Sequence, residues 1–202
     1  DKDRERAETV GYTVVDATTV IATHLTEVIK RHAADLLTRQ ETQKILDHIK
    51  ETAPALVDES LRETQLGGIQ KVLQMLLREG LSIRDMVSIL ETLADKSKQL
   101  PEPIARAEAV RTALARSICE HFKEPDGTIH VVTLSPDLEA RINQNIVFRP
   151  DGAGVNLPVK EMHDLVEAVQ VELKKLIDEG LPPVVLTSPR IRPAVWDHLA
   201  PF

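Results

Sequence analysis

The chain of 202 residues is 42% hydrophobic, which suffices for an ordinary globular core in one or two domains. Its formal net charge of −7 opposes attraction to polyanions, and its 2% of aromatic residues offers few rings on which bases could stack, so we exclude nucleic acid as a partner. No apolar run approaches the ~20 residues that span a bilayer, and the charged start DKDRERAE is no signal peptide. We therefore expect a soluble chain without membrane contact of its own.

The first part of the chain is predicted to contain a strand and a long helix. Residues 9–15 alternate as a half-buried strand does, and Asp16 is a good N-cap for the segment that follows. Helical spacing then continues over about five turns and predicts a helix that packs along one face. The positions on that face are Ile21, Leu25, Val28, Ile29, His32, Leu36 and Leu37.

Two further helices are predicted before the middle of the chain. Thr38 and Glu41 have the spacing of a capping box, so a new helix should begin directly after Thr38. Pro54 opens a short helix that should end at the paired glycines of residues 67–68. The inward-facing positions of these helices are Ile45, Leu46, Ile49, Leu56, Val57 and Leu61.

Residues 67–95 are predicted to form a tight pair of helices around which the rest of the chain is arranged. Gly80 stands where a helix C-terminus needs a residue that tolerates positive φ, and Ser82 with Asp85 resembles the capping-box start of the second helix. The stripes that should be buried are Ile69, Val72, Leu73, Leu76 and Leu77 on the first helix, and Ile83, Met86, Val87, Leu90 and Leu93 on the second.

The composition changes after one more helix, which is predicted over residues 104–118. A turn signal at residues 125–127 precedes the β-branched run 128–134, and a similar run occupies residues 184–187. Each run is followed by Ser-Pro, which predicts a helix start, and a long amphipathic helix over residues 159–177 separates the two runs. Strands separated by helices are usually parallel. The predicted fold is therefore α+β and mainly α: a helical subdomain, then a small α/β subdomain with a short, mostly parallel sheet.

The sequence carries no motif of an enzyme or a metal site. The histidines lack HExxH spacing and an accompanying carboxylate cluster, and no Gly-rich phosphate loop is present. Cys119 and His121 would diverge on a helix, which favours a buried structural thiol over a nucleophile and its base. We predict no catalytic residue, no cofactor and no metal.

One alternative from the enzyme class rests on the second Ser-Pro pair. A helix start at Ser188 and Pro189 would offer free N–H groups to an anion, with Arg190 and Arg192 nearby. This leaves a small anion- or phosphate-binding enzyme domain as an alternative, while ordinary helix capping explains the same residues.

Three separated segments resemble one protein family. They are GYTVVDATTVIATHLTEVIKRHAADLLTRQE from Gly11, VLQMLLREGLSIRDMVSILETLAD from Val72, and VVLTSPRIRP from Val184. In this order they resemble the C-terminal cytoplasmic region of the bacterial type III export gate, the family of the flagellar biosynthesis protein FlhA. The resemblance runs from about Gly11 to the end of the sequence.

The resemblance implies a larger architecture. Members of the family are polytopic inner-membrane proteins whose cytoplasmic region has four subdomains and forms a nine-membered ring below the export channel. The ring is expected of the full-length protein, and a monomer is the alternative for this part alone. In that pattern residues 1–37 are the end of the first subdomain, with a linker, a strand and a long helix. Residues 38–124 are the helical third subdomain, and residues 125–202 are the α/β fourth subdomain, truncated at its C-terminus. Membrane helices and the second subdomain lie outside this sequence.

The function that the resemblance implies is non-enzymatic. Export chaperones with bound cargo dock on the cytoplasmic side of the inner membrane, where an associated ATPase complex also acts, and the cargo passes to the channel. A flagellar gate is favoured over the homologous gate of the virulence injectisome, although the two share most motifs.

The family docks chaperones in a hydrophobic dimple between its first two subdomains. Aligned on the first segment, one wall of the dimple falls on Val15, Val20 and Thr23, which would leave a shallow apolar hollow. Core packing is the alternative role of the valines. Because the opposite wall lies in a subdomain outside this sequence, we expect weak or no chaperone binding by these residues alone.

Contacts between subunits in the family come from the helical third subdomain. Polar residues within its motifs, Arg39, Glu41, Arg84 and Asp85, are candidates for this interface. Each also stands near a predicted helix start, so local electrostatics at helix ends are the alternative.

Overall fold

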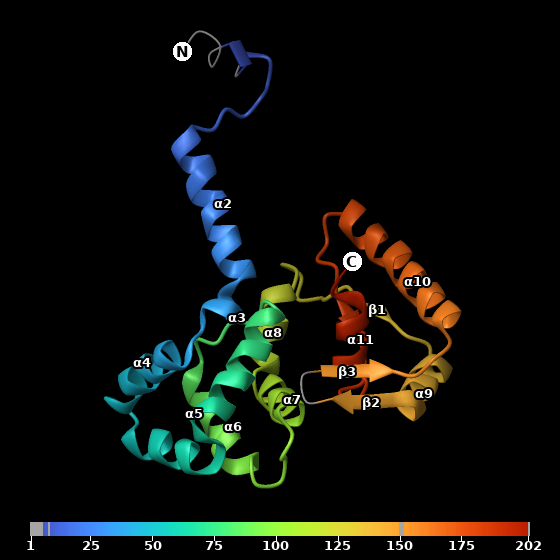
Figure 1. Cartoon of the computed structure of the whole chain (residues 1–202). Coiled ribbons are helices and arrows are strands. Elements are labelled where there is room, and N and C mark those ends of the chain that lie inside the picture. Colours follow the sequence, from blue (N-terminus) through green and yellow to red (C-terminus); the bar gives the residue numbers. More distant parts are fainter. Residues whose placement is uncertain (1–5, 8, 150–151, 202) are drawn as a thin grey trace.

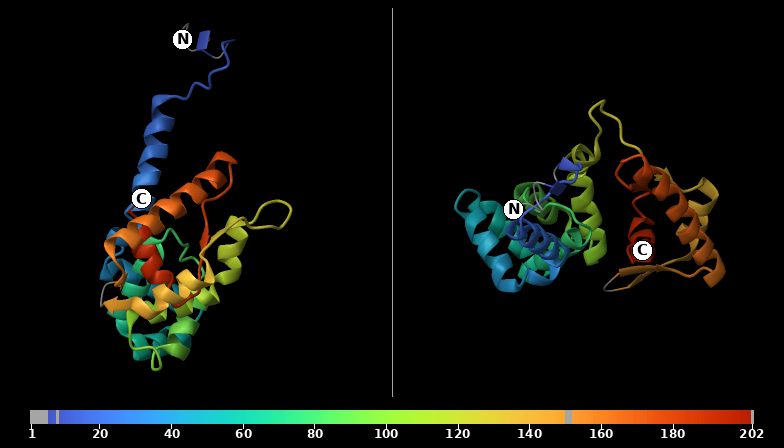
Figure 2. Two further views of the ribbon diagram at one scale, coloured as in Figure 1. Left: turned by 90° about the vertical axis from the view of Figure 1, so that its right-hand side faces the viewer. Right: turned by 90° about the horizontal axis from the view of Figure 1, so that it is seen from above.

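The computed structural model describes residues 6–7, 9–149 and 152–201, and it has two lobes with a helix projecting from one of them (Figure 1, Figure 2). The projecting helix and the helical lobe comprise α2 (Ala17–Arg31), α3 (Ala33–Leu36), α4 (Arg39–Lys50), α5 (Pro54–Arg78), α6 (Met86–Lys96), α7 (Pro103–Ala113) and α8 (Ala115–Phe122). The second lobe comprises β1 (Val132–Thr133), α9 (Pro136–Asn145), β2 (Ile146–Arg149), β3 (Gly152–Val155), α10 (Val159–Asp178), β4 (Val185–Leu186) and α11 (Arg192–Leu199).

The core of the helical lobe lies where α5 packs against α4, α6 and α7. The apolar stripes predicted for these helices supply it, and each large side chain that becomes buried stabilises the fold by roughly 1.5–3 kcal/mol before ordering costs. The most deeply buried members are Leu46, Val57, Ile69, Val72, Leu73, Leu76, Ile89, Leu90, Leu93 and Val110.

The corner between α5 and α6 confirms one prediction and corrects another. Gly80 has φ of 71°, and the amide of Leu81 donates to the carbonyl of Leu76 at 2.9 Å, so the helix ends as predicted. The next helix begins later than predicted, because Asp85 itself is the N-cap and accepts from the amide of Ser88 at 3.1 Å.

The buried face of α6 agrees with the prediction at Met86, Leu90 and Leu93 and differs from it at one predicted position. Val87, which was predicted to be buried, is 43% exposed, and Ile89 is fully buried instead.

α5 contains the break that was predicted at residues 67–68, but the break lies earlier. Gln65 has φ of 58° and ψ of 158°, which interrupts the helix and lets it change direction. The glycines lie in the turn after the kink. A Cβ on Gly67 would stand 2.9 Å from the guanidinium of Arg39, and a Cβ on Gly68 would stand 2.9 Å from the methyl of Thr64. Close packing therefore explains the glycines.

The N-terminal part differs from the prediction. Residues 12–16 carry no regular secondary structure, so the strand predicted over residues 9–15 is wrong: it has no neighbouring strand among the described residues. The predicted long helix is interrupted at His32, which separates α2 from α3. No residue of α2 is buried, so the predicted packing along one face does not occur within this chain.

The second lobe contains two small sheets. β1 pairs with β4 in parallel, with Val132 opposite Val185, as the order of strands and helices predicted. β2 pairs with β3 antiparallel, with Phe148 opposite Ala153, and this pair was not predicted from the sequence. α10 follows its predicted span and covers a core that includes Ile142, Leu165, Val169, Ile191 and Val195. The predicted α+β, mainly α fold class is confirmed.

Candidate functional site

The projecting helix α2 presents an exposed apolar face. Asp16 caps the helix, accepting from the amide of Thr19 at 3.0 Å and from its hydroxyl at 2.6 Å. The side chains along the face remain in contact with solvent although their spacing is that of a buried stripe. They are Ile21 (66% exposed), Leu25 (55%), Val28 (36%) and Ile29 (49%).

The predicted docking residues lie at the start of this helix. Val15 precedes the cap and is 50% exposed, and Val20 is 54% exposed, so within this chain neither valine belongs to a core. Thr23 is also exposed and lies one turn from Val20. At 100° per residue, Thr23 points about 160° away from Ile21, so the predicted docking residues and the apolar stripe occupy different sides of α2.

The predicted subunit-interface residues are all exposed, and two of them serve helix ends. Asp85 is the N-cap of α6, and Glu41 donates its amide to the hydroxyl of Thr38 at 3.2 Å. The carboxylate of Glu41 pairs with Lys44 at 2.9 Å instead of completing the capping box.

The two arginines of that set have no such role at the helix ends. Arg39 and Arg84 are exposed and form no ion pair with any residue that the structure describes. The guanidinium of Arg39 lies over Gly67, at the packing contact between α4 and α5.

A charged network joins the two lobes, and the sequence did not predict it. Arg192, at the start of α11, donates from Nε to both carboxylate oxygens of Glu108 on α7, at 2.9 and 2.8 Å. One of its terminal nitrogens reaches Glu79, at the end of α5, at 2.8 Å. Arg111 on α7 contacts the other oxygen of Glu79. The network thus pairs two guanidinium groups with two carboxylates across the contact between the lobes.

Burial shifts the ionisation of this network. The side chains of Glu79, Glu108 and Arg192 are 10%, 16% and 17% exposed. Burial raises the pKa of Glu79, although both arginines oppose the shift. Burial also lowers the pKa of Arg111, and the charge of Arg192 acts in the same direction. Burial would lower the pKa of Arg192 too, but the hydrogen bonds and charges of Glu108 and Glu79 together outweigh it and raise that pKa.

Sequence reasoning missed this network because its members look like ordinary helix-surface charges. Glu108 and Arg111 each follow an apolar core position of α7 by one residue, Ala107 and Val110 respectively. The available signal was the pair of opposite charges at Glu108 and Arg111, three residues apart along the edge of a buried stripe. This spacing does not identify Arg192 on α11 as their partner.

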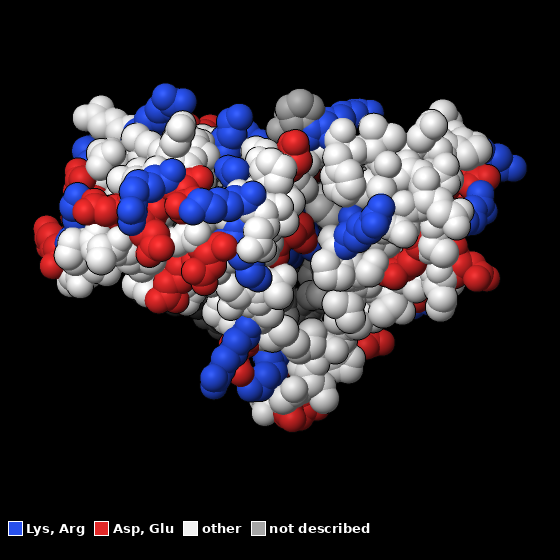
Figure 3. All heavy atoms as spheres, turned by 90° about the horizontal axis from the view of Figure 1, so that it is seen from below, with Lys and Arg blue, Asp and Glu red and all other residues white. Residues whose placement is uncertain are grey.

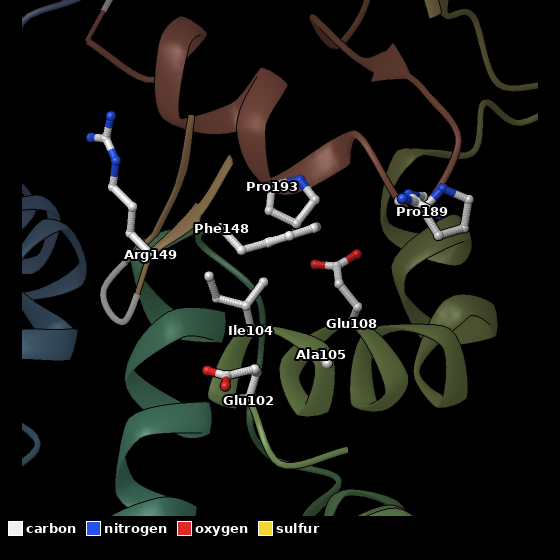
Figure 4. Close-up of a pocket in the computed structure, with 9 residues that line it drawn as sticks. Glu102, Ile104, Ala105, Glu108, Phe148, Arg149, Pro189 and Pro193 are labelled. Atoms are coloured by element: carbon white, nitrogen blue, oxygen red, sulfur yellow. The ribbon is translucent and has the colours of Figure 1, made fainter. Parts of the chain in front are cut away.

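A cavity of about 390 Å³ lies beside the network, between the lobes (Figure 4). Ile104 and Ala105 of α7 line one side, and Phe148 of β2 and Pro193 of α11 line the other. Ile104 and Glu108 point toward Phe148 and Pro193. The surface seen from below is also hollowed between the lobes (Figure 3).

The structure does not support the predicted anion site. The segment after Ser188 forms a turn and α11 begins only at Arg192, so Ser188 and Pro189 do not start a helix. The amide of Ser188 already donates to the carboxylate of Glu139 at 3.0 Å. Arg192 is engaged by Glu108 and Glu79, so its guanidinium is not free to hold a phosphate.

Two further observations bear on chemistry. Cys119 is exposed, so the prediction of a buried thiol is wrong. The neighbouring Ile118, and not Cys119, packs against the core of the helical lobe. Within residues 6–7, 9–149 and 152–201, no group of three or more His, Cys, Asp or Glu side chains could hold a metal ion. In the same part of the chain, every helix is too short or too polar to cross a membrane.

Comparisons with known proteins agree along the whole chain. The sequence model of the FHIPEP family matches residues 1–202. The flagellar biosynthesis protein FlhA of Treponema pallidum is 42% identical over 201 residues, which cover 98% of this chain and 28% of that protein. The chain therefore spans little more than a quarter of this relative.

Solved structures show the same fold. The nonameric SctV-C of EPEC aligns with a TM-score of 0.81 at 26% identity, covering 98% of this chain and 60% of that one. The nonameric EscV cytosolic domain from the type III secretion system aligns with a TM-score of 0.71 at 27% identity, covering 90% of this chain and 53% of that one.

Proposed function

Because the chain belongs to the FHIPEP family, we propose that it is part of the cytoplasmic region of a bacterial type III protein export gate and acts by docking and assembly, not by catalysis. The observation that carries this proposal is the family match along residues 1–202. The subdomain boundaries at residues 37 and 124 belong to the same proposal. We place the whole protein in the bacterial inner membrane, with this part on the cytoplasmic side.

We assign the chain to a flagellar gate. Its identity to FlhA of Treponema pallidum is 42%, against 26% to SctV-C of EPEC over an equal share of the chain. The homologous injectisome gate is the alternative. To distinguish the two, this segment replaces the equivalent segment of FlhA in a flagellated strain, and swimming is measured. Swimming of the strain would support the flagellar assignment.

Assembly into a ring is the first part of the proposed function. Nonameric relatives of the same fold support it. Arg39 and Arg84 are the stronger interface candidates, because each is exposed and forms no ion pair with the described residues. Glu41 and Asp85 remain candidates with local roles at helix ends.

Docking of export chaperones with their cargo is the second part. Val15, Val20 and Thr23 form one wall of the proposed site, and their exposure at the start of α2 leaves them open to a partner. The opposite wall belongs, in the family pattern, to a subdomain outside this sequence. Proteins of the associated ATPase complex are further proposed partners.

Sedimentation velocity over a concentration series tests the assembly proposal. We expect self-association that the Arg84→Glu variant weakens by about tenfold, because a like-charge contact replaces an attractive one in the interface. Circular dichroism should show unchanged helicity. The matched control is Arg116→Glu, because Arg116 is exposed and forms no ion pair with any described residue.

The two possible failures are distinguishable. Equal weakening by both charge reversals would mean that net charge, and not an interface at Arg84, controls association. Loss of helicity in Arg84→Glu would favour the local role at the start of α6. For docking, a flagellar chaperone bound to its cargo is added to the wild-type chain. We expect weak or no binding, because the opposite wall of the docking site lies outside this sequence. Binding at micromolar or tighter affinity would contradict this expectation.

A further inference from the structure

The cavity between α7, β2 and α11 has an apolar lining that the fold leaves unfilled. Phe148 is 51% exposed, and it faces the cavity together with Pro193 (Figure 4). Ile104 and Ala105 form the facing wall. A volume of about 390 Å³ accommodates a leucine, phenylalanine or tryptophan side chain. Since both lobes contribute walls, an occupant would contact both.

The charged groups around this cavity are positive in sum. Glu102, Glu108, Arg149 and Arg190 line it, and Glu108 is paired with Arg192. The network of Arg192 and Arg111 with Glu108 and Glu79 is neutral as a whole, so Arg149 and Arg190 stand against Glu102, a local charge of +1, whereas the chain as a whole carries −7.

The arginines at the mouth are available to a partner. Arg149 and Arg190 are exposed, and neither forms an ion pair or a side-chain hydrogen bond with the part of the chain that the structure describes. The side chain of Arg149 extends away from the cavity, and its guanidinium lies over Gly154 of β3 (Figure 4). A carboxylate near the opening would meet attraction from this side, and Glu102 alone opposes it.

We propose that this cavity is a docking pocket for a peptide segment that inserts one large apolar side chain and places neighbouring carboxylates near Arg190 and Arg149. The apolar walls supply burial for the anchor, and the arginines supply orientation and discrimination against basic segments. A free inorganic anion would leave the apolar walls unused. A wholly apolar ligand would leave the arginines without a partner. The proposal does not depend on the export role.

Methyl and amide NMR titration tests the proposal on the whole chain. The probe is a synthetic octapeptide with a central leucine-phenylalanine pair and aspartates on both sides. We expect saturable shifts of the Ile104 and Ala105 methyl signals. A second peptide has lysines in place of the aspartates, and a third has alanines in place of the apolar pair. Each should bind at least about tenfold more weakly than the first.

Two variants locate the binding. Ala105→Trp fills the cavity and should abolish the shifts, and Arg190→Glu should weaken binding by about tenfold. Arg116→Glu, a charge reversal on α8 outside the cavity lining, should change affinity by no more than about twofold. Thermal unfolding followed by circular dichroism checks that each variant folds; if Ala105→Trp does not fold, Arg190→Glu with its control carries the test.

Several results would overturn the proposal. The first is absence of saturable shifts with the acidic peptide, and the second is equal affinity for the lysine peptide. A third is unchanged peptide binding in Arg190→Glu accompanied by altered self-association, which would mean that a second copy of this chain occupies the cavity.

Discussion

Arg192 is the residue on which the contact between the lobes depends most. Among the residues that the structure describes, its guanidinium alone pairs with both Glu108 and Glu79, and all three side chains are less than one fifth exposed. A buried carboxylate that loses its cation keeps its desolvation cost but loses the attraction that offset it. The stability of the assembled pair of lobes should therefore respond to Arg192 far more than to the exposed arginines around it.

We expect Arg192→Leu to lower the free energy of unfolding by about 3 kcal/mol, because it leaves the buried carboxylate of Glu108 without its cation and Glu79 with Arg111 alone. Urea unfolding followed by circular dichroism measures the change. Arg190→Leu is the matched control, since Arg190 is exposed and lies two residues away; it should change stability by less than about 0.5 kcal/mol. A change below 1 kcal/mol in Arg192→Leu would show that solvent reaches the network and screens it.

At the scale of the element, α5 shows how one helix adopts two directions. The kink uses the positive φ of Gln65, while the glycines that follow permit close approach of neighbouring groups. The two glycines differ in what a side chain would meet. Beside Gly67 lies the end of a long, exposed arginine side chain, and beside Gly68 lies the methyl of the buried Thr64. A flexible side chain can move, whereas a packed methyl cannot.

Alanine substitution at the two positions should consequently have opposite effects. We expect Gly67→Ala to be neutral or to stabilise by up to about 1 kcal/mol, through the helix propensity of alanine, with Arg39 moving aside. Gly68→Ala should destabilise by about 1–3 kcal/mol through overpacking. Thermal or urea unfolding of the two variants side by side gives the comparison. Equal destabilisation at both positions would mean that the kink, and not the neighbouring side chains, requires glycine.

At the scale of the whole molecule, the most unusual feature is the projection of α2 from the helical lobe (Figure 1). A helix with an apolar stripe gains most of its stability by burying that stripe, and α2 has no buried residue in this chain. Such a face favours association with whatever surface can cover it. Ring formation by copies of this chain and contact with other parts of a longer polypeptide are both consistent with it.

Replacing the most exposed apolar residue of this stripe should reduce association. Ile21→Asp should raise the dissociation constant for self-association by about tenfold, because it removes roughly 1.5 kcal/mol or more of apolar burial in the complex. Analytical ultracentrifugation measures the change. The control Thr26→Asp carries the same charge on a position about 140° around the helix and should have a smaller effect. If both variants behave alike, added charge and not the stripe controls association.

Several helix ends and buried stripes of this protein were predictable from its sequence. Asp16 and Ser135 cap helices, and Gly80 ends one, because each effect acts between residues within about one helical turn. The stripes of α5 and α10 followed from the same short-range spacing. The resemblance of three ordered segments added the family, which no single segment specifies.

Only the tertiary structure decided which surfaces meet. The partners of Arg192 lie 84 and 113 residues away along the chain, so no helical period or capping motif could indicate them. The same limit affected α2, whose spacing indicates an apolar face but not whether a partner for that face exists in the chain. It affected β3 as well, because its glycine-rich sequence does not indicate the pairing with β2 that makes it a strand. Local sequence determines the shape of an element and the side it would bury; long-range packing determines what covers that side.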